Sequence, residues 1–144
     1  MKKEKLTFLK PEKRNNLGHL LVEQGISAGF PSPADDFKEI RISLDKEVVK
    51  NKEATFYARV SGSSMEGAGL SDGDLIVIDR SLNPENNKIA VCFIDGDFTV
   101  KRIIKKEGQL YLRPENKNYK KILIQEENQL IIWGIVTYVI KKIK

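Results

Sequence analysis

Short apolar runs, each bounded by turn residues, follow one another through most of the chain and restrict what it can fold into. Apolar and polar side chains alternate in several of these runs, as in Ile40, Ile42 and Leu44. Alternation with a period of two is typical of half-buried β-strands and does not suit a helix. The predicted strands cover residues 40–44, 56–60, 74–79, 88–94, 97–104, 109–113, 121–125 and 130–140.

Two turn sequences indicate that neighbouring strands pair as antiparallel hairpins. Asp95-Gly96 stands alone between two apolar runs, and both central positions of such a turn need φ > 0. Lys106-Glu107-Gly108 indicates a second hairpin. We therefore expect a mostly β fold, with short antiparallel strands in a closed or partly closed sheet.

Residues 1–28 are predicted to form a flexible N-terminal arm outside this sheet. Asn16 is a suitable N-cap for a short helix that ends near Gly25. The apolar face of this helix would consist of Leu17, Leu20 and Leu21. A helix of about two turns is marginal by itself and depends on packing. Pro31 and Pro33 then favour an extended path.

Length and composition favour one cytoplasmic domain. The chain has 144 residues, of which 40% are hydrophobic and 31% charged, as in an ordinary globular protein. The longest apolar run, residues 130–140, is interrupted by Gly134 and Thr137 and is shorter than the roughly 20 residues that cross a bilayer. The basic first residues are not followed by an apolar stretch, so we expect neither a secretory signal nor a membrane partner.

Several classes of function are not favoured. Cys92 is the single cysteine and lies within an apolar run, so we expect a buried core residue rather than a disulfide. No Cys/His cluster indicates zinc, and no metal or cofactor is expected. The net charge of +5 comes from scattered lysines, and no helix-turn-helix pattern is visible. We do not expect sequence-specific DNA binding.

A serine loop and a lysine in an apolar strand together indicate a protease. Ser61-Gly62-Ser63-Ser64-Met65 is a loop of small residues that lets a substrate carbonyl approach. The backbone N–H groups near Ser63 and Ser64 are candidate oxyanion-hole donors. Lys101 can remove a serine proton only if burial lowers its pKa from about 10.4 towards neutrality.

These residues also have ordinary structural interpretations. Most serines in such loops bond to nearby backbone, and a lysine on a strand usually keeps its ammonium in water. Alternation places Lys101 on one face with Thr99 and Ile103, and Arg102 on the other, with apolar residues on both faces. Considered without any relative, the catalytic and the structural interpretation of Lys101 are equally supported.

Taken together, the motifs resemble the LexA-like self-cleaving serine peptidases, and among them the UmuD-like branch. The resemblance covers about residues 24–144, including Gly29–Phe37, the serine loop, Lys101 and Ile132–Val136. One departure is Ser63, where the UmuD-like pattern has Asp. A second departure is the loop that follows, Glu66-Gly67-Ala68-Gly69-Leu70. This loop lies beside the nucleophile but supplies no catalytic side chain of the family, so the departure concerns specificity more than mechanism.

The resemblance implies a LexA/signal-peptidase-like β-fold, Ser64 as nucleophile, Lys101 as general base and self-cleavage between Ala28 and Gly29. A β domain of residues 29–144 would remain. His19, the single histidine, lies in the segment that would be removed, so a Ser–His–Asp triad is implausible. Four acidic residues are candidates for a pair of catalytic acids, but turns and caps explain them. They are Asp35, Asp36, Asp72 and Asp74.

The resemblance also implies partners. UmuD-like proteins are homodimers, are cleaved when a RecA–single-stranded DNA filament favours the cleavable conformation, and join a Y-family polymerase for error-prone synthesis past DNA damage in the SOS response. The first alternative is a non-enzymatic polymerase-binding module that keeps a vestigial dyad. The second is a phage-type or LexA-type repressor fragment, for which the residues before Gly29 are too few to hold a winged helix-turn-helix.

Overall fold

The computed structural model describes residues 6–11, 19–22 and 39–144. They belong to two compact units, one made of residues 1–11 and 51–144 and the other of residues 12–50. The larger unit carries the main β-sheet, and the smaller unit carries a two-stranded ribbon and a short helix.

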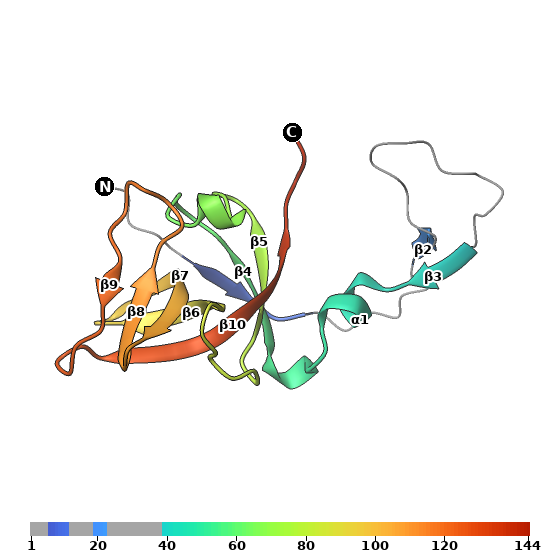
Figure 1. The fold of residues 1–144 in the computed structure, drawn as a ribbon. Helices are drawn as coiled ribbons and strands as arrows, with labels where there is room; N and C mark the ends of the chain where they lie inside the picture. The colour runs from blue at the N-terminus through green and yellow to red at the C-terminus, as the bar shows by residue number, and fades with distance from the viewer. Residues whose placement is uncertain (1–5, 12–18, 23–38) are drawn as a thin grey trace. The chain divides into compact units, whose positions relative to one another are not determined.

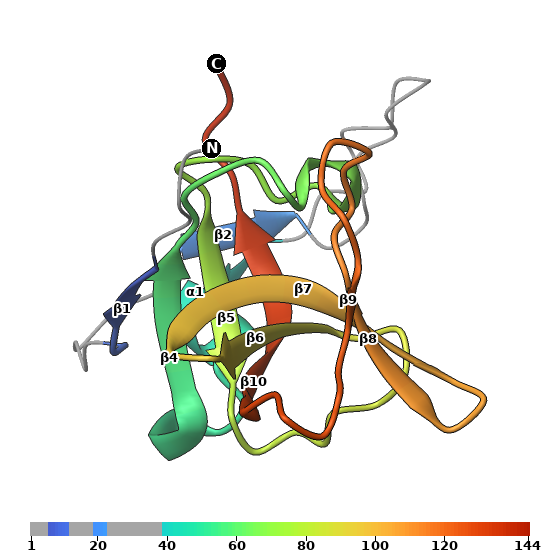
Figure 2. The same ribbon diagram turned by 90° about the vertical axis from the view of Figure 1, so that its left-hand side faces the viewer.

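An eight-stranded sheet makes up most of the larger unit, in the order β1-β4-β5-β10-β6-β7-β8-β9 (Figures 1 and 2). All of its neighbouring strands pair antiparallel. The strands are β1 (Thr7–Leu9), β4 (Thr55–Arg59), β5 (Leu75–Asp79), β6 (Ile89–Ile94), β7 (Asp97–Lys106), β8 (Gln109–Arg113), β9 (Ile122–Leu123) and β10 (Leu130–Ile140). Two 3₁₀-helices, η2 (Lys52–Ala54) and η3 (Glu66–Ala68), precede and follow β4. The predicted mostly β fold of short antiparallel strands is confirmed.

Strand β10 joins the two halves of this sheet. Its first part pairs with β6 and its last part with β5, with Ile135 shared between them. The register shifts between Ile132 and Gly134 and again between Val136 and Tyr138, as expected where a long strand bends. In Figure 2, β6 and β7 run across the direction of β4 and β5, so the sheet curls strongly along its length.

The two predicted hairpins are confirmed. Asp95 and Gly96 have φ values of 47° and 90° and connect β6 to β7. Glu107 and Gly108 have φ values of 52° and 74° and connect β7 to β8. Positive φ at both central positions gives the turn the twist that antiparallel neighbours need.

Two apolar clusters form the core on either side of the sheet's centre. One contains Ala58, Val60, Met65, Leu70, Ile76, Ile78, Val91 and Val100. The other contains Ala90, Cys92, Ile103, Leu112 and Ile135. Ala90 and Val91 of β6 belong to different clusters, and so do Val100 and Ile103 of β7. Alternation places the members of each pair on opposite faces, so both strands are covered on both faces. Cys92 is buried as predicted, and burial raises the pKa of its thiol to about 12.

The smaller unit differs from the sequence prediction. His19–Val22 forms strand β2, which pairs antiparallel with β3 (Glu39–Ile42), so the helix predicted to include these residues is wrong there. Leucine spacing is compatible with either structure, and pairing with β3 decides between them. Leu44 begins helix α1 (Leu44–Val48) instead of ending a strand. Asn16, Leu17, Gly25, Pro31 and Pro33 lie outside the described residues.

Strand β1 was not anticipated, because its residues fall within the predicted arm. Thr7, Phe8 and Leu9 pair with Arg59, Ala58 and Tyr57 of β4, which makes β1 the outermost of the described strands on that side of the sheet. The rest of residues 1–28, apart from 6–11 and 19–22, lies outside the described residues.

The packing of β5 gives a stability prediction. Ile78 is fully buried in the first cluster, so Ile78→Ala should lower the free energy of unfolding by about 2–5 kcal/mol through lost burial and the cavity left behind. Ile131→Ala, at a side chain that is 58% exposed, should change it by no more than about 0.5 kcal/mol. Urea unfolding of both variants measures the difference. Equal losses would contradict this assignment of the core.

Candidate active site

The serine loop, Ser61–Met65, connects the end of β4 to η3. Gly62 takes φ = 102°, a value that L side chains rarely adopt, and its N–H donates to Asp72 Oδ1 at 2.8 Å. This bond ties the loop to the turn that precedes β5. The tight turn directs Ser64 inwards, where it is buried.

Lys101 lies in the middle of β7, opposite Ala90 of β6, and only 6% of its surface is exposed. Its Nζ donates to Ser64 Oγ at 3.0 Å, to Thr99 Oγ1 at 2.7 Å and to the Val100 carbonyl at 3.1 Å. These oxygens match the three N–H donors of an ammonium group. The structure therefore brings the two residues singled out in the sequence into direct contact inside the protein.

Side chains of β7 alternate between its two faces, as the sequence pattern predicted. Thr99 and Lys101 share one face, where their side chains bond to each other. Arg102 points the other way and donates from Nε to Glu115 Oε1. The guanidinium of Arg102 therefore bonds to Glu115, and Lys101 is the basic side chain of β7 that contacts Ser64.

The loop after β8 holds the serine loop in place, and sequence reasoning missed it. The Glu115 N–H donates to the Ser64 carbonyl at 2.8 Å, and Asn116 Nδ2 donates to the Ser63 carbonyl at 2.7 Å. The hydroxyls of Ser63 and Tyr119 lie 3.2 Å apart. Residues 114–121 show only turn-like polar composition in the sequence, and nothing in that pattern indicates which distant loop they contact.

Gly67 makes close contact with the same loop. Its N–H donates to the Glu115 carbonyl at 2.7 Å, and a Cβ at this position would lie 2.5 Å from that oxygen. No larger residue fits without moving the backbone. The backbone carbonyl of Glu115 thus accepts from Gly67 of η3, and its N–H donates to the carbonyl of Ser64, the nucleophile candidate. Both bonds hold the segment from Ser64 to Gly67 against the loop after β8.

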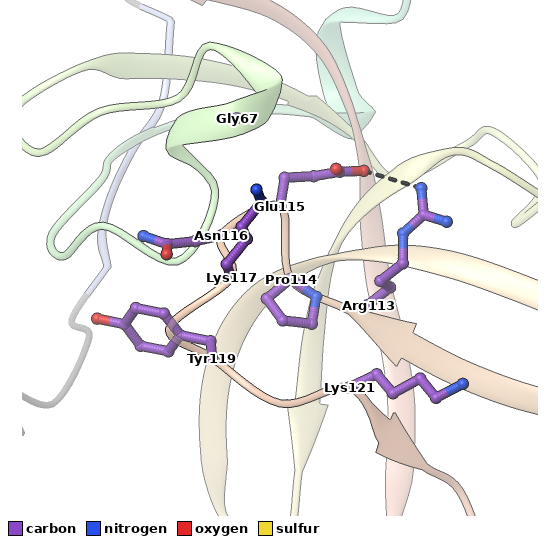
Figure 3. Close-up of a pocket in the computed structure, with 8 residues that line it drawn as sticks. All are labelled: Gly67, Arg113, Pro114, Glu115, Asn116, Lys117, Tyr119 and Lys121. Carbon is purple, nitrogen blue, oxygen red and sulfur yellow. Dashed lines mark hydrogen bonds and ion pairs between the residues drawn. The ribbon is translucent and has the colours of Figure 1, made fainter.

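Two arginine side chains, Arg102 and Arg113, contact the carboxylate of Glu115. The hydrogen bond from Arg102 holds the pKa of its carboxyl below the usual range, against the opposing effect of burial, and Arg113 Nη2 adds a second contact at 3.1 Å. Figure 3 shows Glu115 and Arg113, joined by their ion pair, among the residues that line a surface hollow. The hollow is lined by Gly67, Arg113, Pro114, Glu115, Asn116, Lys117, Tyr119 and Lys121.

The acidic residues near the serine loop have structural roles, in agreement with the sequence interpretation. Asp72 accepts from Gly62, and Asp74 accepts from the Ser71 N–H at 2.8 Å and from Lys141 Nζ. Burial tends to raise the pKa of Asp74, but the bonds from Lys141 and Ser71 outweigh it and hold the pKa below its usual value.

Other predicted site residues are not brought together here. Ala28 and Gly29, the expected cleavage site, and Asp35 and Asp36 lie outside the described residues. The backbone of His19 belongs to β2, and its side chain is not described. Within the described residues, no group of His, Cys, Asp and Glu side chains is arranged to hold a metal ion. Nor does any helix in that part of the chain have the length and apolar character needed to cross a membrane.

Comparison with known proteins identifies the family. Residues 20–137 match the family described as Peptidase S24-like. Protein MucA of Salmonella typhimurium is 42% identical over 116 residues, which cover 80% of this chain and 79% of MucA. Protein SamA of Salmonella typhimurium strain LT2 is 39% identical over 122 residues, covering 85% and 84%.

A repressor is also similar. The LexA repressor of Clostridium kluyveri is 40% identical over 101 residues, which cover 70% of this chain but 50% of the repressor. The family match spans most of the chain and includes the serine loop, β7 and most of β10. The chain therefore belongs to the Peptidase S24-like family, as a UmuD-like self-cleaving serine peptidase that serves in SOS mutagenesis.

Proposed function

We propose that this chain cuts its own Ala28–Gly29 bond, with Ser64 as the nucleophile and Lys101 as the general base. One observation carries the proposal: Lys101 Nζ lies 3.0 Å from Ser64 Oγ, and both side chains are buried. A serine hydroxyl is a weak nucleophile until an adjacent base takes its proton, and such a base must lie within hydrogen-bond reach.

The burial of Lys101 supports its proposed role as that base. Removing an ammonium group from water disfavours its charged form, whereas hydrogen bonds to oxygens favour it. Lys101 experiences both effects, because it is 6% exposed and contacts Thr99 and Val100 as well as Ser64. The neutral amine is the active form, so the rate of self-cleavage should rise with pH.

The reaction then follows acyl transfer. Neutral Lys101 takes the hydroxyl proton while Ser64 Oγ bonds to the carbonyl carbon of Ala28. The Lys101 ammonium returns the proton to the nitrogen of Gly29, and the peptide bond breaks, leaving an ester on Ser64. Lys101 next activates a water molecule, which hydrolyses the ester and restores the hydroxyl.

The loop after β8 suggests how the oxyanion would be stabilised. Asn116 fixes the carbonyl of Ser63, and in a trans peptide the following N–H points in the opposite direction. The Ser64 N–H is therefore directed away from Asn116. The proposal assigns the backbone N–H groups of Ser63 and Ser64 as oxyanion donors, a role worth about 3–4 kcal/mol per donor in comparable enzymes.

The wider role follows from membership of the family. The proposal is a cytoplasmic homodimer, activated by a RecA–single-stranded DNA filament, whose residues 1–28 are removed. Residues 29–144 would then act with a Y-family polymerase in error-prone synthesis across damaged DNA. The UmuD-like relatives support this role, and the buried Ser64–Lys101 contact favours an active peptidase over a vestigial one.

The role of Lys101 is tested by pH and by substitution. Self-cleavage without activator should rise with pH and level off once the amine is neutral. Lys101→Arg should be inactive at every pH, because a guanidinium stays protonated. Lys106→Arg, an exposed lysine on the same strand, should cleave as the unmodified chain does. Gel-based cleavage rates across the alkaline range give the comparison, and activity of the Lys101 variant would assign the base elsewhere.

The role of Ser64 and the cleaved bond are tested together. Ser64→Ala should abolish cleavage. Ala28→Trp should block it by bulk, whereas Ala28→Ser keeps a small side chain and should be cut. N-terminal sequencing of the larger product should start at Gly29. A start at another residue would move the cleavage site but leave the Ser64–Lys101 chemistry unaffected.

The role of Asn116 predicts a rate effect without a change of base. Asn116→Ala removes the bond to the Ser63 carbonyl, so the plateau rate should fall about fivefold, as for the loss of a bond worth about 1 kcal/mol. The pH midpoint should stay unchanged, because Lys101 is untouched. Asn118→Ala, at an exposed side chain in the same loop, is the matched control. A shifted midpoint would contradict a purely positioning role.

A further inference from the structure

Strand β1 reaches the main sheet from a segment that the proposed cut would detach. Its residues pair antiparallel with β4, and none of the other described strands lies beyond it in the sheet order (Figure 2). β4 is otherwise paired only with β5 among the described strands. If β1 leaves, β4 becomes an edge strand with unpaired backbone N–H and C=O groups, which is a template for another strand.

One face of β1 packs against an aromatic cluster formed by Phe56, Phe98 and Trp133. Leu6 and Phe8 pack against the first apolar cluster, and the Phe8 ring contacts the rings of Phe98 and Trp133. Its ring centroid is 4.7 Å from that of Trp133 and 5.1 Å from that of Phe98. Leu9 faces the other way and is 48% exposed. The packing between β1 and the larger unit therefore involves the side chains at alternate positions of an extended chain.

The same face continues to Lys10. Its Nζ lies 4.3 Å from the ring centroid of Phe56 and donates to the Glu53 carbonyl at 3.2 Å. Phe56 in turn stacks edge-on against Trp133 at 5.0 Å. Leu6, Phe8 and Lys10 thus present the pattern apolar, apolar, basic at every second residue. The larger unit offers a partner for each: the first apolar cluster for Leu6, the rings of Phe98 and Trp133 for Phe8, and the ring of Phe56 for Lys10.

The covalent link explains why so short a strand is held. While the chain is intact, β1 binds to β4 as a segment of the same molecule, at an effective concentration that does not depend on the protein concentration. Any cut between residues 11 and 51 makes this binding bimolecular. The other pairing across the proposed cut, β2 with β3, is a two-stranded ribbon, which is marginally stable by itself. At micromolar protein, the detached segment should therefore leave.

We propose that self-cleavage uncovers the β4 edge and its aromatic cluster as a docking site for an extended peptide segment of a partner protein. This inference rests on the proposed self-cleavage, although not on the identity of the cut bond. The partner segment adds to β4 as an antiparallel strand and carries two apolar residues and a basic residue at alternate positions, in place of Leu6, Phe8 and Lys10. In the uncut chain, β1 occupies that site and keeps it closed.

Trp133, the single tryptophan, reports directly on the site because Phe8 packs against it. In the first experiment, cleaved chain is separated by size-exclusion chromatography and compared with uncut Ser64→Ala chain. The expected result is loss of the small fragment, a red shift of Trp133 emission and greater quenching by acrylamide. A fragment that stays bound, or unchanged emission after its loss, would overturn the proposal.

A second experiment tests the site without any cleavage. The full chain carrying Ser64→Ala and Phe8→Ala should show the red-shifted Trp133 emission, whereas Ser64→Ala with Leu9→Ala should not. A peptide with the sequence of residues 4–11 should then restore the blue-shifted emission, and the same peptide with Phe8→Ala should not. Far-UV circular dichroism checks that each variant is folded.

The two experiments separate the two claims. If no cut chain forms, the proposed function fails, while peptide binding to the double variant still decides whether the site exists. Failure of the peptide to restore emission in a folded variant would reject the docking site even where cleavage proceeds. A larger assembly of the cleaved chain than of the uncut Ser64→Ala chain, with Trp133 emission restored and no peptide present, would assign the edge to a second copy and overturn the partner assignment.

Discussion

The contact between Lys101 Nζ and Ser64 Oγ depends on a strand that is covered on both faces. β7 lies between β6 and β8 and contributes residues to both apolar clusters, so a lysine at its centre is removed from water. An exposed lysine at the same distance from a serine would stay protonated and would not act as a base at ordinary pH. The proposed role of Lys101 therefore depends on burial, which the fold provides and the residue types alone do not.

The position of Ser64, the proposed nucleophile, depends on a different part of the chain. The serine loop is tied to the turn before β5 through Asp72 and to the loop after β8 through Glu115 and Asn116. These bonds fix the backbone on both sides of Ser64 before any substrate binds. Such preorganisation is what makes a polar site effective, because no reorganisation is needed during the reaction.

The sequence predicted the strands and hairpins well, because a period of two and Asp95-Gly96 are local signals. The closeness of Ser64 and Lys101 is not local; it was inferred from a family resemblance and not from alternation. β1 was missed because three residues carry too little pattern and its partner β4 is distant in the chain. β2 was mistaken for helix because its pairing with β3 outweighs the local leucine spacing.

The central claim is that neutral Lys101 is the base for Ser64. It is tested most directly by following the side-chain nitrogen of Lys101 by heteronuclear NMR across the alkaline range, alongside the rate of self-cleavage in the same samples. The account predicts that the titration of Nζ and the rise in rate have the same midpoint. A Lys101 ammonium that persists at pH values where cleavage has already levelled off would contradict it.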